Sequence, residues 1–260
     1  MTTLSYAATD SATMLRRNLR HAVRYPSMTI SGAIMPIVIL LLFVFVFGST
    51  LGAGLHTGHG RYIDYIAPGI IFMAAISGSM ATAVGVCTDM TEGIINRFRT
   101  MAISRSAVIT GHVVGNVIQT AVSLVMVIGV ALLAGFRPHA SAAGWLAAVG
   151  LLLLACLALT WLAAALGLVA KKVETASNLP LPLQFLPFIG SAIVPPRSMP
   201  AGVRWFAEYQ PFTPIIETLR DLLAGTHVGA NGVIAVAWCV GIGLAGYLWA
   251  RAAFRRAAAR

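Results

Sequence analysis

Long apolar stretches alternate with short polar segments along this chain of 260 residues. A helix needs about 20 mostly apolar residues to cross the hydrocarbon core of a bilayer. Six segments meet that requirement, so the pattern predicts an all-α membrane protein with six transmembrane helices. Their approximate bounds are 27–47, 63–86, 107–134, 142–170, 176–194 and 230–250. The fifth segment is the least regular, because Pro180, Pro182 and Pro187 interrupt it.

The residues around these spans divide the chain into three parts. Residues 1–26 are predicted to form a cytoplasmic N-terminus, residues 27–251 the transmembrane domain, and residues 252–260 a basic cytoplasmic tail. Between residues 11 and 25, apolar side chains recur near helical spacing with four arginines among them. This pattern favours a helix lying in the membrane interface over a basic flank that only sets the topology.

Composition and charge agree with a membrane protein. Only 10% of the residues are charged and 58% are hydrophobic, whereas a soluble domain carries about a quarter charged residues. With six spans, thirteen Lys and Arg residues fall in the set of loops that includes both termini, and five fall in the other set. The termini of this multi-pass plasma-membrane protein are therefore expected in the cytoplasm. Contact with anionic membrane lipids accounts for the net charge of +10, and no nucleic-acid partner is expected.

The polar segment between the second and third spans is longer than a tight hairpin needs. Within it, Ile94, Ile95, Phe98 and Met101 recur at helical spacing. A short cytoplasmic amphipathic helix of this kind is suited to docking into a groove on a soluble partner. The alternative is a turn that only closes the hairpin.

The stretch from Asp89 to Val114 resembles the coupling segment of ABC-2-type exporter permeases, in particular those similar to daunorubicin-resistance permeases. The family pattern is approximately D-x-x-x-G-x-x-[DN]-R-x-R-x-[ML]-P-[IM]-S-R, and this chain departs from it at Ala102, where proline is usual. The resemblance implies a cytoplasmic coupling helix that transmits ATP-driven movement from a separate subunit. The residues that the resemblance assigns to this coupling are Glu92, Gly93, Arg97, Phe98, Arg99, Ser104 and Arg105.

A second stretch, from Pro196 to Arg220, is similar to the outer motif of the same family, with Gln210 in place of the usual asparagine. The resemblance implies an extracellular re-entrant or interfacial helical segment and a fold like that of type V ABC exporters. An ordinary amphipathic helix on the outer rim is the alternative, since its apolar stripe fits both. The motif residues are Pro211, Thr213, Pro214, Glu217 and Arg220.

The third predicted span carries a polar face. His112, Asn116, Gln119 and Ser123 follow the spacing i, i+4, i+7, i+11 and therefore share one side of a helix. Polar groups in a membrane helix face other helices or a water-filled path. The pattern leaves two interpretations: a lining for the substrate path, or hydrogen bonds between helices. We favour the second, because such bonds need no special role.

Catalytic and metal-binding motifs are absent from the sequence. It contains no Gly-x-x-x-x-Gly-Lys-[Ser/Thr] phosphate loop, so we expect a transport subunit without catalytic residues or a cofactor of its own, with ATP bound by a partner. His56 and His59 lack a third ligand, and no metal site is expected. The glycine-rich stretch 241–246 lies inside an apolar span and is interpreted as a packing surface.

The resemblance implies a membrane subunit of an ATP-binding cassette exporter. Such a permease forms a homodimer, or a heterodimer with a similar permease, and each protomer binds a nucleotide-binding ATPase subunit. The apolar spans favour a hydrophobic or amphiphilic substrate, such as a drug, an antibiotic, a polyketide or a lipid, expelled by bacterial efflux. The alternative is an ion-gradient-driven secondary transporter or channel. Such proteins carry carboxylates inside the membrane, whereas here only Asp64 and Glu174 lie near predicted span ends.

Overall fold

The computed structural model describes residues 26–54, 61–91 and 105–258. Every regular element within these ranges is a helix, and they contain no strand. The predicted interfacial helix between residues 11 and 25 lies outside the described residues.

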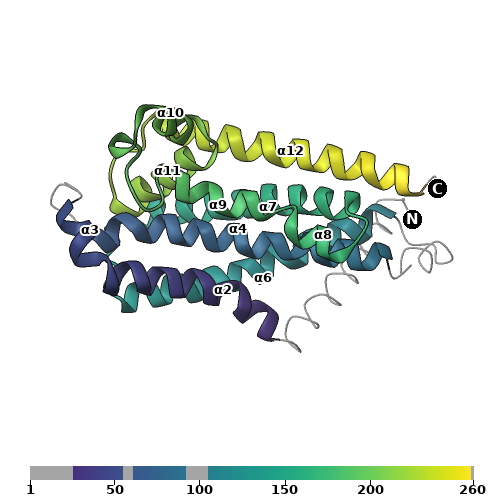
Figure 1. The fold of residues 1–260 in the computed structure, drawn as a ribbon, viewed down its shortest axis with the longest axis horizontal. Helices are drawn as coiled ribbons and strands as arrows, with labels where there is room; N and C mark the ends of the chain where they lie inside the picture. Colours follow the sequence, from purple (N-terminus) through teal and green to yellow (C-terminus); the bar gives the residue numbers. More distant parts are fainter. Residues whose placement is uncertain (1–25, 55–60, 92–104, 259–260) are drawn as a thin grey trace.

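Four helices form the long axis of the molecule (Figure 1). Each is long and apolar enough to cross a membrane, and each coincides with a predicted span, so four of the six spans are confirmed. They are α4 (Tyr62–Thr91), α6 (Arg105–Leu133), α7 (Ala142–Val169) and α12 (Ala230–Ala258). Helix α12 continues through most of the region predicted as a basic tail.

The other two predicted spans have a different form. The first comprises α2 (Pro26–Leu41), which contains Pro36, followed by a π-helical turn, η1 (Leu42–Val46), and a short helix, α3 (Gly48–Gly54). A proline inside a helix removes one backbone hydrogen bond and crowds the preceding turn. The count of six uninterrupted spans is therefore not confirmed within the described residues.

The fifth predicted span is a succession of short helices instead of one long helix. Its elements are α8 (Val173–Asn178), α9 (Leu181–Phe185) and the 3₁₀ turn η2 (Leu186–Ile189). Pro180 lies between the first two elements, and Pro187 lies within the last. Because proline lacks an N–H group and disfavours helix in the residue before it, these prolines divide the segment.

Helices α4 and α7 lie in the middle of the bundle, with α2 and α6 on one side and α12 on the other (Figure 1). Glycine allows the closest contacts. A Cβ added at Gly167 of α7 would overlap the carbonyl oxygen of Ala83 in α4. A Cβ at Gly246 of α12 would lie 2.7 Å from the backbone nitrogen of Leu162 in α7. These contacts match the close helix packing that small residues permit in membranes.

One end of the bundle is built from short helices: η3 (Pro196–Ser198), α10 (Ala201–Tyr209) and α11 (Phe212–Ala224). Helix α11 packs against α4, α7 and α12, and Phe212 meets Phe72 of α4 edge-on at 5.3 Å between ring centroids. In contrast, Trp205 and Tyr209 of α10 are 66% and 67% exposed. Aromatic side chains with a polar tip are favoured where a membrane meets water.

Candidate functional site

The predicted coupling segment joins the last turn of α4 to the first turn of α6. Glu92, Gly93, Arg97, Phe98, Arg99 and Ser104 lie outside the described residues. Arg105 is the first residue of α6. Their role in coupling stays a prediction, and the described helices define only where the segment begins and ends.

A histidine–aspartate pair connects the two helices at this point. Asp89, which the sequence pattern assigned to the loop, lies instead in the last turns of α4. Its Oδ2 atom is 2.7 Å from Nε2 of His112 in α6, and the two side chains are only 14% and 19% exposed. Sequence reasoning placed both residues near the cytoplasmic face but did not pair them. Pairing across 23 residues depends on how the two helices pack, which periodicity does not specify.

Asn116 joins three helices. Its Nδ2 atom donates to the carbonyl oxygen of Gly78 in α4 at 3.1 Å. Its Oδ1 atom lies 3.3 Å from the hydroxyl of Thr120 in α6 and 3.4 Å from that of Thr160 in α7. Gly78 permits this approach, because a Cβ there would come 2.5 Å from the Thr120 hydroxyl oxygen.

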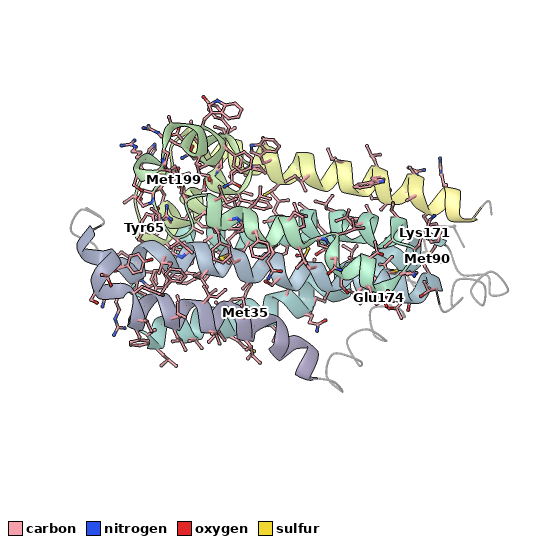
Figure 2. All side chains as sticks on the ribbon, viewed as in Figure 1. Met35, Tyr65, Met90, Lys171, Glu174 and Met199 are labelled. Carbon is pink, nitrogen blue, oxygen red and sulfur yellow. The ribbon has the colours of Figure 1, made fainter. Side chains whose placement is uncertain are left out.

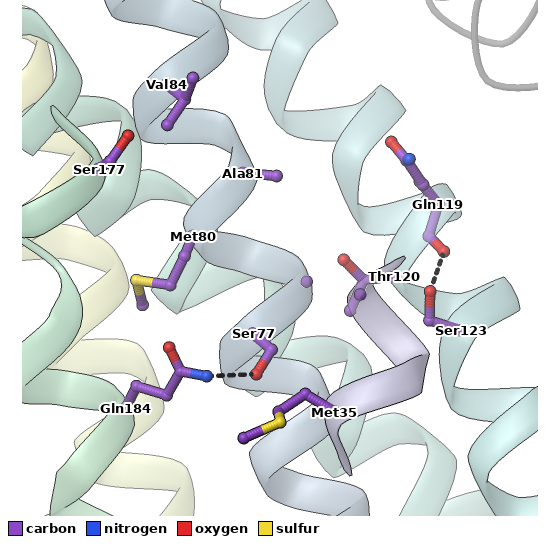
Figure 3. Close-up of a pocket in the computed structure, with 12 residues that line it drawn as sticks. Met35, Ser77, Met80, Ala81, Val84, Gln119, Thr120, Ser123, Ser177 and Gln184 are labelled. Carbon is purple, nitrogen blue, oxygen red and sulfur yellow. Dashed lines mark hydrogen bonds between the residues drawn. The ribbon is translucent and has the colours of Figure 1, made fainter. Parts of the chain in front are cut away.

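The remaining two polar-face residues, Gln119 and Ser123, line a pocket of about 290 Å³. The polar face is therefore divided: His112 and Asn116 form contacts between helices, whereas Gln119 and Ser123 border a cavity. Figure 3 shows this pocket between helices α2, α4, α6, α8 and α9. Gln184 of α9 donates from Nε2 to the Ser77 hydroxyl of α4 at 3.0 Å.

The outer motif begins with a compact polar cluster. Pro211 precedes the first residue of α11, and Pro214 is buried in its first turn. The hydroxyl of Thr213 donates to the carbonyl oxygen of Ala207 at 2.6 Å, and Nε2 of Gln210 donates to that of Leu186 at 3.1 Å. These bonds hold the start of α11 against α10 and η2, which explains why polar residues occur in an apolar setting.

Arg220 lies on the inner side of α11, half-buried between α4 and the turn after η2. Its Nε atom donates to the carbonyl oxygen of Tyr65 at 3.1 Å, and Nη2 donates to that of Ser191 at 2.6 Å. Its guanidinium carbon lies 3.9 Å from the centroid of the Tyr65 ring, a cation–π distance. Burial lowers the pKa of the Arg220 guanidinium, and the nearby Tyr65 and Glu217 oppose that shift.

Glu217 connects α11 to another helix. Its spacing from Arg220 and Asp221 would allow local pairing within α11, but among the described ion pairs none includes Arg220. Glu217 instead accepts a hydrogen bond from Asn231 of α12 at 2.8 Å. Burial raises the pKa of the Glu217 carboxyl above its ordinary value, while the charge of Arg220 opposes the rise. Each residue therefore connects α11 to a neighbouring segment.

No set of three or more metal-ligating side chains gathers within the described parts of the chain. His56 and His59 lie outside those parts. The three cysteines, Cys87, Cys156 and Cys239, are free and buried, as small packing residues are.

The long apolar helices and the short helices at one end define a helical, multi-pass membrane protein (Figure 2). Residues 10–224 match the ABC-2 type transporter family. The chain belongs to the ABC-2 type transporter family.

Several named relatives are similar over most of their length. The daunorubicin resistance ABC transporter permease protein DrrB1 of Streptomyces coeruleorubidus is 26% identical over 239 residues, which cover 92% of this chain and 82% of that protein. A probable doxorubicin resistance permease, DrrC, of Mycobacterium tuberculosis is 23% identical, with 82% and 77% covered. A putative transport permease, ycf38, of Porphyra purpurea is 25% identical, with 86% and 78% covered.

Proposed function

We propose that this protein is the export permease of an ATP-binding cassette transporter, which moves a hydrophobic or amphiphilic molecule out of the cell. Candidate substrates are a drug, an antibiotic, a polyketide or a lipid. The family match over residues 10–224 carries this proposal, because it includes both the predicted coupling segment and the outer motif. The printed names of two relatives, which refer to daunorubicin and doxorubicin resistance, agree with a substrate of this kind.

A separate nucleotide-binding subunit supplies the ATP hydrolysis in this proposal. It docks on the coupling segment at Glu92, Gly93, Arg97, Phe98, Arg99, Ser104 and Arg105. The permease forms a dimer with a second copy or with a similar chain. The end of the bundle that holds Lys171 and the last turn of α12 faces the cytoplasm.

The Asp89–His112 contact supports this arrangement mechanically. It joins α4 and α6 next to the two ends of the coupling segment. A movement imposed on that segment is then passed to both helices together. Asn116 extends the connection to α7, because its side chain contacts groups in α4, α6 and α7.

Within the part of the chain that the structure describes, the same contact also favours ion-gradient transport, because carboxylates and histidines in membrane helices serve as proton relays. Its position weighs against that role, since Asp89 lies near the end of α4 and not midway along it. Of the two carboxylates near predicted span ends, Asp64 lies in the first turn of α4 and accepts a hydrogen bond from the Arg137 backbone N–H at 3.1 Å. Glu174 lies in the first turn of the short helix α8.

Co-purification with an ATPase subunit tests the proposal. Tagged permease is purified in detergent after co-expression with the nucleotide-binding subunit encoded beside it. We expect a stable complex with vanadate-sensitive ATPase activity. Arg97→Glu should abolish the complex or its coupled export without preventing membrane insertion, because it reverses a charge in the docking helix.

Arg204→Glu is the matched control, since Arg204 is exposed in α10 at the opposite end of the bundle. It should leave the complex intact. Transport that persists without any associated ATPase and stops with a protonophore would overturn the proposal in favour of the ion-gradient alternative.

A further inference from the structure

The pocket of about 290 Å³ lies midway along the bundle. Ser77 and Met80 belong to the middle turns of α4, while Gln119 and Ser123 belong to the middle of α6. Its volume is close to the lower limit of about 300 Å³ for pockets that hold small molecules. A ligand here would therefore be bound at the depth of the hydrocarbon core.

The lining combines apolar surface with hydrogen-bonding groups. Met35 of α2 and Met80 of α4 contribute thioether side chains, and two amides, Gln119 and Gln184, face the pocket from different helices (Figure 3). Thioethers adapt to ligands of different shape. Among the described residues, the Oε1 atom of Gln184 accepts no hydrogen bond, because only its Nε2 atom is engaged, by Ser77. That oxygen can accept a hydrogen bond from a ligand hydroxyl or amide.

None of the twelve described residues that line the pocket is charged. A cation or anion in this position would lose its hydration without gaining a counter-ion, which is strongly unfavourable at membrane depth. The hydrogen-bonding groups, in contrast, discriminate in favour of a ligand that offers a partner, since unpaired buried polar groups are costly. The lining therefore selects by charge as well as by polarity.

We propose that this pocket binds an uncharged, largely apolar molecule that carries a hydroxyl or amide group, with Gln184 as the residue that recognises that group. The inference rests on the proposed function in taking the ligand to be an exported molecule. Met35 of α2 lines the pocket and is 57% exposed, so we expect a ligand to enter from that side of the bundle.

Photolabelling tests the proposal with three probes of one shape. Full-length permease in nanodiscs is irradiated with 4-hydroxybenzophenone, benzophenone or the cationic 4-(trimethylammonio)benzophenone. Excited benzophenones insert readily at methionine, so mass spectrometry reports labelling of Met35 and Met80. We expect the hydroxyl probe to label these residues about fivefold more than benzophenone, the ratio that one hydrogen bond provides, and the cation to label them least.

Variants separate recognition from folding. Gln184→Leu should remove the fivefold preference for the hydroxyl probe, and Gln184→Glu should increase labelling by the cation. Asn178→Leu, which removes an exposed amide outside the pocket, should change neither. Ala81→Phe fills the pocket without removing a hydrogen bond and should reduce labelling by the hydroxyl and unsubstituted probes. If gel filtration shows that Gln184→Leu does not fold, Ala81→Phe alone still tests whether the probes bind in the pocket.

Three results would overturn the proposal: equal labelling by the cation and the hydroxyl probe, an unchanged preference in Gln184→Leu, or loss of labelling when phosphatidylglycerol is added. The last result would identify the pocket as a groove for lipid tails. The permease is labelled alone, so these results leave the proposed function standing. Conversely, if no ATPase subunit co-purifies with the permease but the hydroxyl probe still labels Met35 and Met80, the export function is rejected and the pocket proposal is retained.

Discussion

Several polar side chains inside the bundle connect one element to another. Asn116 bonds to α4 across the bundle, and Arg220 bonds to α4 and to the turn after η2. No water is present in the hydrocarbon core to satisfy such groups, so a polar residue there must find a partner in the protein. The partner therefore fixes which segments lie together.

Arg220 provides the sharpest test at this scale. Arg220→Lys retains the charge but loses the planar fork that reaches the carbonyl oxygens of Tyr65 and Ser191. We expect it to lower the stability of the outer end by about 1–3 kcal/mol, the cost of leaving buried acceptors unpaired. Fluorescence-detected thermal unfolding in detergent measures this change.

Arg204→Lys is the matched control for that measurement. Arg204 is about half exposed and pairs with Glu208 of the same helix at 2.8 Å. Exposed pairs of this kind contribute little, so the melting temperature should change by a value equivalent to less than about 1 kcal/mol. An equal effect of the two substitutions would show that Arg220 has no special structural role.

At the scale of elements, small residues determine how closely the helices approach. Gly243 of α12 lies against Ala158 of α7, and Gly246 lies against Leu162, whereas Gly241 has no atom near the position of an added Cβ. The glycine-rich stretch 241–246 is thus a packing surface on one side only. Gly243 and Gly246 contact α7 and Gly241 does not, a difference that the spacing of the glycines alone does not predict.

Gly246→Ala should push α12 away from α7, because the new Cβ would lie 2.7 Å from the Leu162 nitrogen. We expect a loss of stability of about 1–3 kcal/mol from overpacking. Gly241→Ala should be neutral or slightly stabilising, since alanine is about 0.5–1 kcal/mol better than glycine within a helix. Thermal unfolding of the two variants in parallel makes the comparison, and equal melting temperatures would contradict the packing described for Gly246.

The Asp89–His112 contact predicts a defect in coupling under the proposed function. Asp89→Asn and His112→Ala should each weaken the connection between α4 and α6, so that more ATP is hydrolysed for each molecule exported. The exchange variant Asp89→His with His112→Asp should restore part of the coupling, because it reconstructs the pair in reverse. The ratio of export to ATP hydrolysis in proteoliposomes measures this. If the exchange variant folds but its ratio of export to ATP hydrolysis stays as low as in the single variants, the contact has no mechanical role in coupling.

At the scale of the whole molecule, lysine and arginine are more numerous in the set of loops that includes both termini than in the other set. Figure 2 shows Lys171 and Glu174 at one end and Tyr65 and Met199 at the other. From the positive-inside rule we expect the first end to face the cytoplasm. The exposed Trp205 and Tyr209 of α10 are then at the outer interface, where such side chains are favoured.

Cysteine labelling in whole cells tests this orientation. Each substitution is introduced into a chain whose three buried cysteines are replaced by alanine or serine. Ser198→Cys, in η3, should react with a membrane-impermeant maleimide in intact cells, because it is exposed at the predicted outer end. Lys172→Cys should react only after the cells are permeabilised. The reverse pattern would show that the bundle is inserted the other way round.

The sequence by itself determined the class of membrane protein, the four long spans and the relation to export permeases. Apolar length and helical periodicity are local properties, so the bounds of α4, α6, α7 and α12 could be predicted to within a few residues at most ends. Only the tertiary structure decided that His112 meets Asp89, that Arg220 bonds to backbone carbonyls and not to its neighbours in α11, and that Gln119 borders a pocket. The bonded residues are 23 positions apart in the Asp89–His112 pair and 155 positions apart in the Arg220–Tyr65 pair. Such contacts depend on how the helices pack, which no local pattern encodes.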